Sequence, residues 1–580
     1  MPDIKQDVLD MLRELTELTM LDEGDPQSFR VRAYESALHG VEAHAGDLNA
    51  LSAKQLQSIE GVGKSTAEKI RELVETGRVA KLDTLRDKYP PSVVALLRVQ
   101  GLGPKAVKRL RAELGVESLA DLERVVAEHK IRELKGFGAK SEEKLAQTLA
   151  RMRQQDHGAR TPISVALPLA ERVVARLREV PGVTHASYCG SLRRFNETVG
   201  DVDILVVAAE PGQVMDTVTQ LSMVDHVLAR GETKTSVVTR RGTQIDVRVV
   251  ASSQLGAALL YFTGSKGHNI KLRQRALSQG MTLSEYALAR IEGGEVVASE
   301  TEADIYAALG LPFIPPVLRE DAGEIEAAER GLLPGALGAV VGDFHVHSEL
   351  SRDARPSLDE LISAAKARGY AALAITEHAE GVHVGVGREP LLEQKQKVQA
   401  LQAQLGDSLR LLHGVELNIG PNGELDYDLE FRRSFDFCLA SVHDHFDLDR
   451  ERQTRRIVTA MQDPAVRMIG HLSARTIGAR PPIDLDLDAV FKAAAETGTA
   501  LEINGSLPRL DLSVDALRRA RSYAVTLVLT SDAHEVKELD RVQYAKLQAE
   551  RAWVSPEALI NVGSAERLLA WTAQPKRAGA

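Results

Sequence analysis

The carboxy-terminal third of the sequence repeats one pattern that leaves few folds open. Seven short apolar runs follow one another, most of them end in a histidine, aspartate or glutamate, and helical patterns lie between most of them. Strands that alternate with helices predict a parallel sheet, and ligands at the carboxyl ends of such strands gather at one face of a barrel. The runs are GDFHVH, ALAITEH, LLHGVEL, FCLASVHDH, RMIGH, TALEIN and LVLTSDAH. We therefore expect an α/β barrel of the (βα)7 type over residues 342–574.

Eight side chains near the ends of these runs are candidate metal ligands. A mixture of imidazole and carboxylate donors suits Zn²⁺ or Mn²⁺ better than Mg²⁺ alone. One histidine at a strand end is usually structural, whereas six of them in HxH, xxH and DxH spacings predict a metal centre. The candidates are His345, His347, His378, Glu416, His443, His471, Asp532 and His534.

The stretch YCGSLRRFNETVGDVDILVV (188–207) predicts a second chemical site. Its end is typical of a buried strand, and because side chains alternate along a strand, Asp201 and Asp203 project from one face. A second apolar run, TQIDVRVV, supplies Asp246 in a similar setting. Three carboxylates on neighbouring strands can hold two Mg²⁺ or Mn²⁺ ions about 3.5–4 Å apart, the arrangement that two-metal nucleotidyl transfer requires.

The residues just before these aspartates suit a triphosphate. The backbone of Gly190 and Ser191 can donate hydrogen bonds, and the guanidinium groups of Arg193 and Arg194 can pair with phosphate oxygens. The alternative is that the aspartates cap a strand and the arginines are surface charges. The whole combination is far more specific than any of its members alone, so we expect a nucleotide site.

Three short glycine hairpins recur in the amino-terminal region: IEGVGKSTAEKI, VQGLGPKAVKRL and LKGFGAKSEEKL. The first shares its end with a phosphate-binding P-loop, but a P-loop needs a glycine where Ser58 stands and a buried strand before it. Two glycines allow instead a sharp turn and a close phosphate, which the amides of the next helix would face. The predicted contacts to a DNA backbone are Gly61, Gly63, Lys64, Lys69, Gly101, Gly103, Lys105, Gly136 and Gly138.

Composition limits the remaining possibilities. A chain of 580 residues suggests several domains, and its two distant cysteines exclude a disulfide scaffold. No run of 18 apolar residues and no signal-peptide pattern occurs, so we expect a cytoplasmic protein without a membrane partner. The net charge of −10 argues against nucleic acid, but the stretches 98–112 and 266–275 carry basic residues and no carboxylate. Local charge decides where a polyanion docks.

Taken together, these motifs resemble the bacterial-type family X DNA polymerases, with a DNA polymerase beta-like core, over nearly the whole chain. The glycine hairpins look like helix–hairpin–helix elements, and 188–207 with Asp246 looks like the polymerase palm. YFTGSKGHNIKLR (261–273) is similar to the family's nucleotide-binding segment, and LGLPFIPPVLRE (309–320) to its thumb. The resemblance implies that Tyr261, Phe262 and Gly264 line the sugar pocket, that Asn269 contacts the base or the minor groove, and that Lys266 contacts phosphate.

The resemblance extends to both ends of the chain. The region around FRVRAYESA (29–37) and the first hairpin is similar to the small domain that binds the 5′-phosphate of a gap. Relatives with 5′-deoxyribose-phosphate lyase activity have a Schiff-base lysine at the position of Lys69, and the sequence leaves open whether Lys69 does this or contacts phosphate.

The carboxy-terminal third resembles the PHP phosphoesterase domain, whose members bind up to three metals and cleave phosphodiesters or phosphomonoesters. Two departures stand out. The family's Ser-Asp-Gly turn is replaced by Ser351-Arg352-Asp353-Ala354, and its Asp-His pair by Glu377-His378. These departures put one of the three metal sites in doubt.

The implied molecule is a multidomain, monomeric polymerase that fills short gaps in base excision repair. It would act on gapped or nicked double-stranded DNA with dNTPs, and its PHP domain would be a 3′→5′ exonuclease or phosphodiesterase. Two alternatives stay open: a degenerate polymerase core beside an active phosphoesterase, and a non-catalytic DNA-bridging scaffold. The expected domains are an all-α helix–hairpin–helix region (a 5′-phosphate-binding domain at 1–86 and a fingers-like domain at 87–158), an α+β nucleotidyltransferase palm at 159–255, a thumb at 256–318, a linker at 319–341 and the PHP barrel at 342–574.

Overall fold

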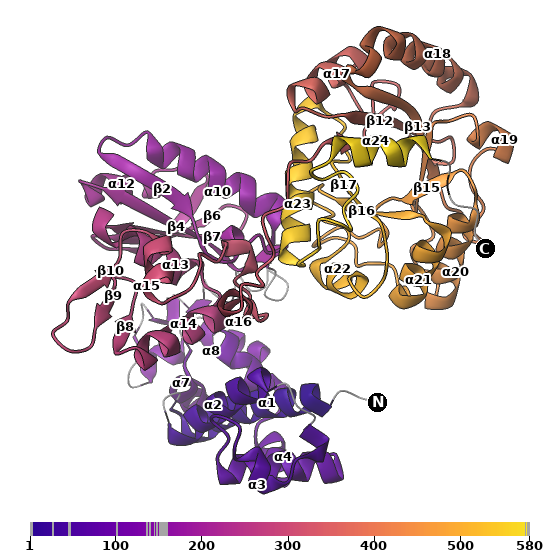
Figure 1. Cartoon of the computed structure of the whole chain (residues 1–580). Coiled ribbons are helices and arrows are strands. Elements are labelled where there is room, and N and C mark those ends of the chain that lie inside the picture. Colours follow the sequence, from indigo (N-terminus) through magenta and orange to yellow (C-terminus); the bar gives the residue numbers. More distant parts are fainter. Residues whose placement is uncertain are drawn as a thin grey trace. The chain divides into compact units, whose positions relative to one another are not determined.

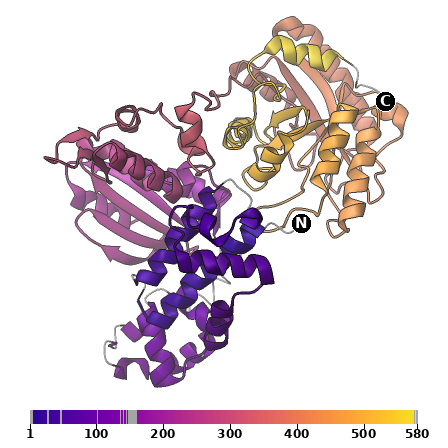
Figure 2. The same ribbon diagram turned by 60° about the horizontal axis from the view of Figure 1, so that its bottom comes forward.

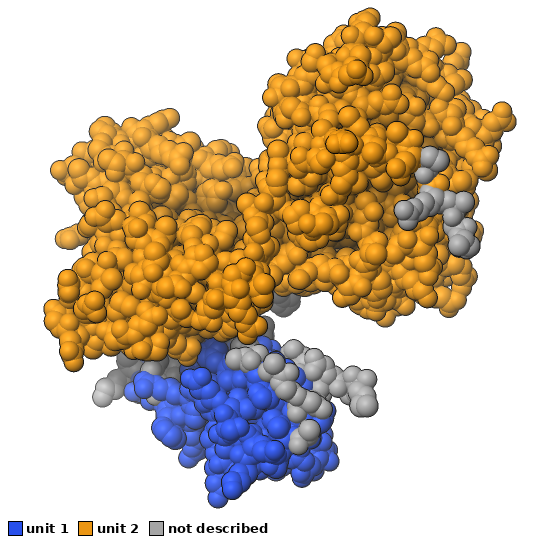
Figure 3. Space-filling model, viewed as in Figure 1, with its two compact units in different colours: residues 1–159 blue, residues 160–580 orange. Residues whose placement is uncertain are grey.

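The computed structural model divides the chain into two compact units, residues 1–159 and residues 160–580 (Figure 3). The residues that the structure describes are 4–25, 28–44, 48–99, 102–134, 137–138, 141–143, 145–146, 149, 160–574 and 576. Among the helices so described, none combines the length and the apolar character that crossing a bilayer requires.

The first unit is helical throughout its described part (Figure 2). The long helix α1 (Ile4–Glu23) contributes a row of buried leucines to the core of this unit. Helices α4 (Lys64–Thr76) and α7 (Pro104–Leu114) each begin directly after a glycine of the first two hairpins, as the sequence predicts. The other helices are α2 (Phe29–Ala43), α3 (Ala53–Leu56), α5 (Ala80–Lys88), α6 (Pro91–Val94) and α8 (Leu119–Ala127).

The second unit begins with a five-stranded sheet in the order β2–β4–β7–β6–β5 (Figure 1). Strands β4 and β7 run parallel to each other, and the other neighbours in the sheet are antiparallel. Helix α10 packs on the sheet through a core that takes Val202, Ile204 and Val206 from β4. The aspartates that alternate with these residues therefore lie on the opposite face. The elements are α10 (Ile163–Arg178), β2 (Val183–Tyr188), β4 (Asp201–Ala208), α12 (Pro211–Thr219), β5 (Val224–Arg230), β6 (Lys234–Thr239) and β7 (Gln244–Val250).

A smaller α+β region follows the sheet. It has its own apolar core, which includes Tyr306 and Leu318. Helix α16 (Glu324–Glu329), in the segment expected to be a linker, adds Ile325 and Ala328 to that core. The remaining elements are α13 (Leu255–Thr263), α14 (Lys266–Ser278), β8 (Met281–Leu283), β9 (Leu288–Arg290), β10 (Val296–Ala298) and α15 (Glu302–Ala308).

The last region is the barrel that the sequence predicts. Seven parallel strands pair in chain order from β11 to β17, and an isolated parallel bridge between Val346 and Ala533 brings the two ends nearly together. Phe344, Phe437 and Trp571 pack together at one end of the interior. The strands are β11 (Gly342–Asp343), β12 (Ala372–His378), β13 (Arg410–Asn418), β14 (Phe437–Ser441), β15 (Val466–Ile469), β16 (Ala500–Asn504) and β17 (Leu527–Thr530).

Helices alternate with most of these strands, so the expected (βα)7 architecture is confirmed (Figure 1). Strands that are buried and apolar over most of their length suit a parallel sheet that is covered by helices. The helices are α17 (Leu358–Ala367), α18 (Arg388–Leu405), α19 (Leu429–Arg432), α20 (Arg450–Gln462), α21 (Leu487–Thr497), α22 (Val514–Ala520), α23 (Val542–Arg551) and α24 (Ala565–Ala573).

Candidate active sites

The three palm aspartates meet on one face of the sheet. The parallel register of β4 and β7 places Asp203 opposite Asp246, and Asp201 opposite Gln244. Burial, followed by repulsion from the carboxylates of Asp201 and Asp246, raises the pKa of Asp203 to about 7. Burial and Asp246 likewise raise the pKa of Asp201 above its ordinary value. Mutual repulsion of this kind is what divalent cations relieve, so the trio fits metal ions.

Asp246 differs from the other two aspartates. Burial would raise its pKa, but hydrogen bonds from Gln244, Ser236 and Lys234 lower it below the ordinary value. Gln244 donates at 2.9 Å, and the Lys234 ammonium lies 3.1 Å from the carboxylate. Lys234 belongs to no recognisable motif, so its position beside Asp246 could not be predicted from the sequence.

Gly190 brings the backbone against the aspartates. It begins the short helix α11 (Gly190–Arg193) with a φ of +63°. A Cβ atom at this position would lie 2.6 Å from the Asp203 Oδ2 atom. A side chain there would strain the backbone and displace the carboxylate.

The two arginines of the motif lie where palm and thumb meet. Arg193 donates to both oxygens of Glu302, at 3.0 and 2.7 Å, and to the Thr263 hydroxyl at 2.7 Å. Arg194 donates to Glu320 at 3.0 Å and to the Thr263 carbonyl. The predicted contact of Arg194 with a triphosphate therefore requires that its guanidinium exchange Glu320 for phosphate.

The segment 261–273 forms the end of α13 and most of α14. The guanidinium of Arg273 lies 5.2 Å from the ring centre of Tyr261, and that of Arg248 lies 4.7 Å from that of Phe262. The Asn269 amide donates to the Tyr261 carbonyl at 2.8 Å, while its buried Oδ1 has no hydrogen-bond partner among the described atoms. Gly264 follows α13, and Lys266 is exposed at the start of α14.

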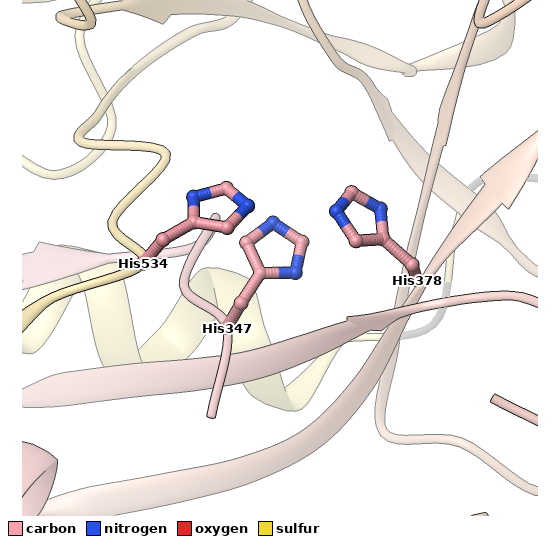
Figure 4. Close-up of side chains that lie close together, drawn as sticks. All are labelled: His347, His378 and His534. Atoms are coloured by element: carbon pink, nitrogen blue, oxygen red, sulfur yellow. The ribbon is translucent and has the colours of Figure 1, made fainter. Parts of the chain in front are cut away.

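All eight predicted ligands of the barrel come together at the carboxyl end of its strands. They form four overlapping groups whose ligand atoms lie within 4.8 Å of one another, and Figure 4 shows one of them, His347, His378 and His534. The other groups are His345, His471 and Asp532; His345, His347 and Glu416; and His378, Glu416 and His443.

Glu416 lies at the centre of these groups. Its Oε1 atom lies 2.9 Å from Nε2 of His471 and 3.3 Å from Nε2 of His443, and its Oε2 atom lies 2.8 Å from Nδ1 of His378. Both ring nitrogens of the fully buried His347 lack a hydrogen-bond partner among the described atoms. Burying such groups is costly unless something binds them, and a cluster of several ring nitrogens and carboxylates is a donor set that suits metal ions. The residues present thus fit metal ions.

The departure at residues 351–354 supplies a carboxylate after all. The Oδ2 atom of Asp353 lies 3.4 Å from Nε2 of His378 and 3.5 Å from Nε2 of His534. Burial opposes its ionisation, but these two histidines hold the pKa of Asp353 far below its ordinary value. Asp353 therefore lies beside two of the candidate ligands, although it was not among the ligands predicted from the sequence.

Two buried glutamates orient the cluster. Glu377 accepts hydrogen bonds from the hydroxyls of Ser348 and Ser351 and from the Gln394 amide, so it fixes the loop that carries Asp353. Glu502 accepts from Nδ1 of His345 at 2.6 Å and from the Thr530 hydroxyl at 2.6 Å. A carboxylate on one ring nitrogen directs the other nitrogen toward a metal. Glu502 escaped the sequence analysis because it stands inside an apolar run.

In the first unit, the glycine hairpins form tight turns before helices. Gly61 has a φ of +76°, and a Cβ atom there would lie 2.3 Å from the Ser36 carbonyl oxygen. Gly63 and Gly103 cap α4 and α7, with Lys64 and Lys105 exposed in the first turns. Gly138 is followed by helical residues 141–143, whereas Gly101 and Gly136 lie outside the described residues.

Lys69 is the residue on which lyase chemistry would depend. Its ammonium donates to the Ser65 hydroxyl at 2.8 Å and lies 5.8 Å from the ring centre of Tyr34. Burial lowers the pKa of Lys69 below its ordinary value. A lowered pKa is what a Schiff-base lysine needs.

Known protein families and relatives match this chain over both candidate sites. Four family profiles match parts of the chain: a helix-hairpin-helix domain at 3–79, a SAM-like helix-hairpin-helix tandem at 93–151, a DNA polymerase beta thumb at 258–320 and a PHP domain at 343–506. The chain is also 35% identical, over 564 residues, to the Bacillus subtilis protein named DNA polymerase/3'-5' exonuclease PolX, with 97% of this chain and 98% of that protein covered. The chain belongs to the family X DNA polymerases.

Two further relatives each match a part of this family X polymerase. DNA polymerase lambda of Rattus norvegicus is 28% identical over 322 residues, which are 50% of this chain and 52% of that protein. A probable phosphatase of Syntrophotalea carbinolica is 28% identical over 234 residues, which are 38% of this chain and 90% of that protein. Half of the chain thus aligns with about half of a DNA polymerase. A little over a third of the chain aligns with nearly the whole length of a probable phosphatase.

Proposed function

We propose that this family X polymerase fills short gaps in DNA during repair and degrades DNA from 3′ ends in its barrel. The observation that carries the proposal is the aligned trio of Asp201, Asp203 and Asp246, in a chain that also holds a complete histidine and carboxylate cluster. A relative that covers almost the whole chain is named for both activities. The helix–hairpin–helix regions bind the DNA.

In the palm, Asp201, Asp203 and Asp246 would hold Mg²⁺ or Mn²⁺. When bound, these ions supply the positive charge that activates the primer 3′-hydroxyl and neutralises the departing pyrophosphate. Asp246 would take the hydroxyl proton, because its lowered pKa keeps its carboxylate ionised and so able to accept a proton, whereas the pKa values of Asp201 and Asp203 are raised. The 3′-oxygen then bonds to the α-phosphorus of the dNTP as the bond to pyrophosphate breaks.

Other palm and thumb residues would position the nucleotide. The backbone at Gly190 and Ser191 faces the triphosphate, and Arg194 moves from Glu320 to a phosphate oxygen as the thumb closes. Tyr261, Phe262 and Gly264 line the sugar pocket and Lys266 contacts phosphate. Asn269 keeps its buried, unpaired Oδ1 close to this segment, where a base or minor-groove donor could reach it.

In the barrel, the eight predicted ligands together with Asp353 would hold up to three ions, Mn²⁺ or Zn²⁺. When bound, such ions activate water and stabilise the leaving oxygen of a phosphodiester. Glu502 fixes the tautomer of His345, and Glu377 holds the loop of Asp353. The donor set, rich in imidazole, favours Mn²⁺ or Zn²⁺ over Mg²⁺.

The proposal extends to partners and domains. Gapped or nicked duplex DNA would dock its backbone at Gly61, Gly63, Lys64, Lys69, Gly103, Lys105 and Gly138, with dNTPs as substrates of a monomer that acts in the cytoplasm. The 5′-phosphate-binding domain would span 1–86, the fingers-like domain 87–158, the palm 159–255, the thumb 256–318 and the PHP domain 342–574.

One assay tests both activities. A one-nucleotide gapped duplex with a 5′-phosphate is incubated with Mg²⁺ or Mn²⁺, with and without dNTPs, and wild type is compared with Asp203→Ala and His347→Ala. We expect extension to disappear only in the first variant and 3′-degradation only in the second. If no variant extends the primer while wild type degrades it, the chain is a phosphoesterase with a degenerate polymerase core. If wild type and both variants neither extend nor degrade the primer, so that the substitutions change nothing, the chain is a non-catalytic scaffold.

A further inference from the structure

A palm carboxylate reaches into the barrel. Glu197 precedes the short strand β3 (Thr198–Val199) in the palm. It accepts two hydrogen bonds from Arg475, from Nη1 at 2.9 Å and from Nη2 at 2.8 Å, and one from Gln548 of α23 at 3.3 Å. Arg475 follows the candidate ligand His471 by four residues, and its side chain is only 11% exposed. The pair is therefore a largely buried, bidentate link between the two regions.

The same guanidinium group of Arg475 also holds a barrel loop. Its Nε atom donates to the Arg509 carbonyl at 2.8 Å, and Nη2 also donates to the Leu510 carbonyl. The guanidinium thus joins Glu197 on one side to the segment 509–511, which follows β16, on the other. One planar group thus contacts Glu197 and the segment at the same time.

The segment 509–511 in turn touches the metal cluster. The Arg509 guanidinium lies 3.4 Å from the carboxylate of Asp532. The Asp511 carbonyl accepts from the Asn504 backbone at 2.5 Å, and the Asn504 amide donates to Asp532 at 3.1 Å. Asp532 is a candidate ligand, so two routes of direct contact connect it to the segment that Arg475 holds.

We propose that Glu197 of the palm is a positioning residue for the phosphodiester hydrolysis of the barrel, an inference that rests on the proposed function of that site. Through Arg475 it fixes the segment 509–511, which orients Asp532 and keeps the Arg509 cation at the edge of the cluster. That cation is 25% exposed, where a substrate phosphate can contact it.

Loss of Glu197 would leave the Arg475 charge without its partner. A buried, unpaired guanidinium is strongly unfavourable and turns toward the nearest carboxylate. Asp511 is fully buried, and its Oδ1 atom has no hydrogen-bond partner among the described residues. Arg475 would rotate toward Asp511, release the carbonyls of Arg509 and Leu510, and so displace Arg509 and Asp532.

The same palm loop offers a matched control. Arg551 of α23 donates to the Phe195 carbonyl at 2.7 Å and to the Asn196 side chain at 2.6 Å, but the described contacts of Arg551 do not include segment 509–511. Asn196→Ala therefore weakens the link between palm and barrel without freeing Arg475. Glu197→Gln weakens it through Arg475.

The test uses the full-length protein with Mn²⁺ and a DNA that has a recessed, labelled 3′ end. For Glu197→Gln we expect the maximal rate of degradation at saturating DNA to fall about tenfold or more, KM to rise by a smaller factor because Arg509 is displaced as well, and half-saturation to need more Mn²⁺. Glu197→Asp should recover part of the activity. Gap extension by Glu197→Gln, and both activities of Asn196→Ala, should equal those of wild type.

If Glu197→Gln degrades DNA at the wild-type rate, the inference is overturned. An equal loss of degradation in Asn196→Ala also overturns it, because general packing between the palm and the barrel would then explain both effects. If Glu197→Gln does not fold, Arg475→Lys decides, because a lysine cannot hold Glu197 and both carbonyls together, and unaltered degradation by it refutes the proposal. An absence of degradation in wild type itself would instead refute the proposed function of the barrel.

Discussion

At the scale of single residues, Asp203 is the palm carboxylate whose ionisation is most disfavoured in the folded protein. Its pKa is raised from 3.8 to about 7 by burial and by two neighbouring carboxylates. As pH rises, the unfolded chain therefore loses this proton at a lower pH than the folded chain does. The metal-free folded state consequently loses stability between about pH 4 and about pH 7. A site built to bind cations is destabilised without them, which is a common cost of function.

Asp203→Asn should abolish DNA synthesis and yet stabilise the metal-free protein. With EDTA present, we expect the free energy of unfolding to rise by roughly 2–4 kcal/mol at pH 8 and by clearly less at pH 5, because the ionised carboxylate is the species that is penalised. Thermal or denaturant unfolding at the two pH values measures this. Asp447→Asn, at an exposed position, should change stability equally little at both. A gain that does not depend on pH contradicts the assignment.

Gly190 is a second residue on which the palm depends, because of its backbone conformation and its contact with Asp203. Gly190→Ala would place a Cβ atom 2.6 Å from Asp203 at a positive φ. We expect DNA synthesis to fall at least about tenfold and stability to fall by about 1–2 kcal/mol, as measured by primer extension and by unfolding. Gly212→Ala, which meets no atom within 4 Å, should leave both properties close to those of wild type. Full activity of Gly190→Ala would show that this contact does not matter.

At the scale of elements, strand patterns predicted the barrel and its ligands because strands of one parallel sheet end at one face. The same local patterns could not reveal partners far away in the chain. Arg193 pairs with a carboxylate 109 residues away, and Arg194 with one 126 residues away. Glu502 was missed because the sequence of a buried strand does not show whether its glutamate orients a distant histidine or has a purely structural role. One metal site was doubted because Ser351-Arg352-Asp353-Ala354 stands where the family has a Ser-Asp-Gly turn, and the sequence could not show that Asp353 still lies beside His378 and His534.

The loop that carries Asp353 gives a prediction at this scale. Asp353→Ala should lower the number of Mn²⁺ ions bound per chain by about one and reduce 3′-degradation about 10–100-fold, because its carboxylate faces two candidate ligands. Metal analysis after dialysis, together with the degradation assay, measures both effects. Gap extension should not change, and Asp407→Ala, exposed in the short 3-10 helix Gly406–Ser408, should match wild type throughout. Unchanged metal content would exclude Asp353 as a ligand.

At the scale of the whole molecule, a net charge of −10 coexists with DNA binding because charge is distributed locally. Lys64 and Lys105 are exposed at the helix starts of two hairpins. Lys64→Glu combined with Lys105→Glu should weaken binding to gapped DNA and reduce the slope of log K against log salt by about two. Binding titrations at several salt concentrations test this. Lys397→Glu combined with Lys492→Glu, at exposed positions of barrel helices α18 and α21, is the charge-matched control, and an equal effect there would contradict specific docking.

The two sites also differ in donor chemistry, and this difference should divide their activities by metal. The palm offers carboxylates alone, which suit Mg²⁺, whereas the barrel offers six imidazoles around a few carboxylates, which suit Mn²⁺ or Zn²⁺. We therefore expect Mg²⁺ alone to support gap extension with little 3′-degradation, and added Mn²⁺ to raise degradation about tenfold or more. Asp203→Ala isolates the barrel reaction and His347→Ala the palm reaction in the same assay. Equal degradation with Mg²⁺ and Mn²⁺ in Asp203→Ala would mean that the imidazoles do not select the metal, and the ligand assignment of the barrel would then have to be revised.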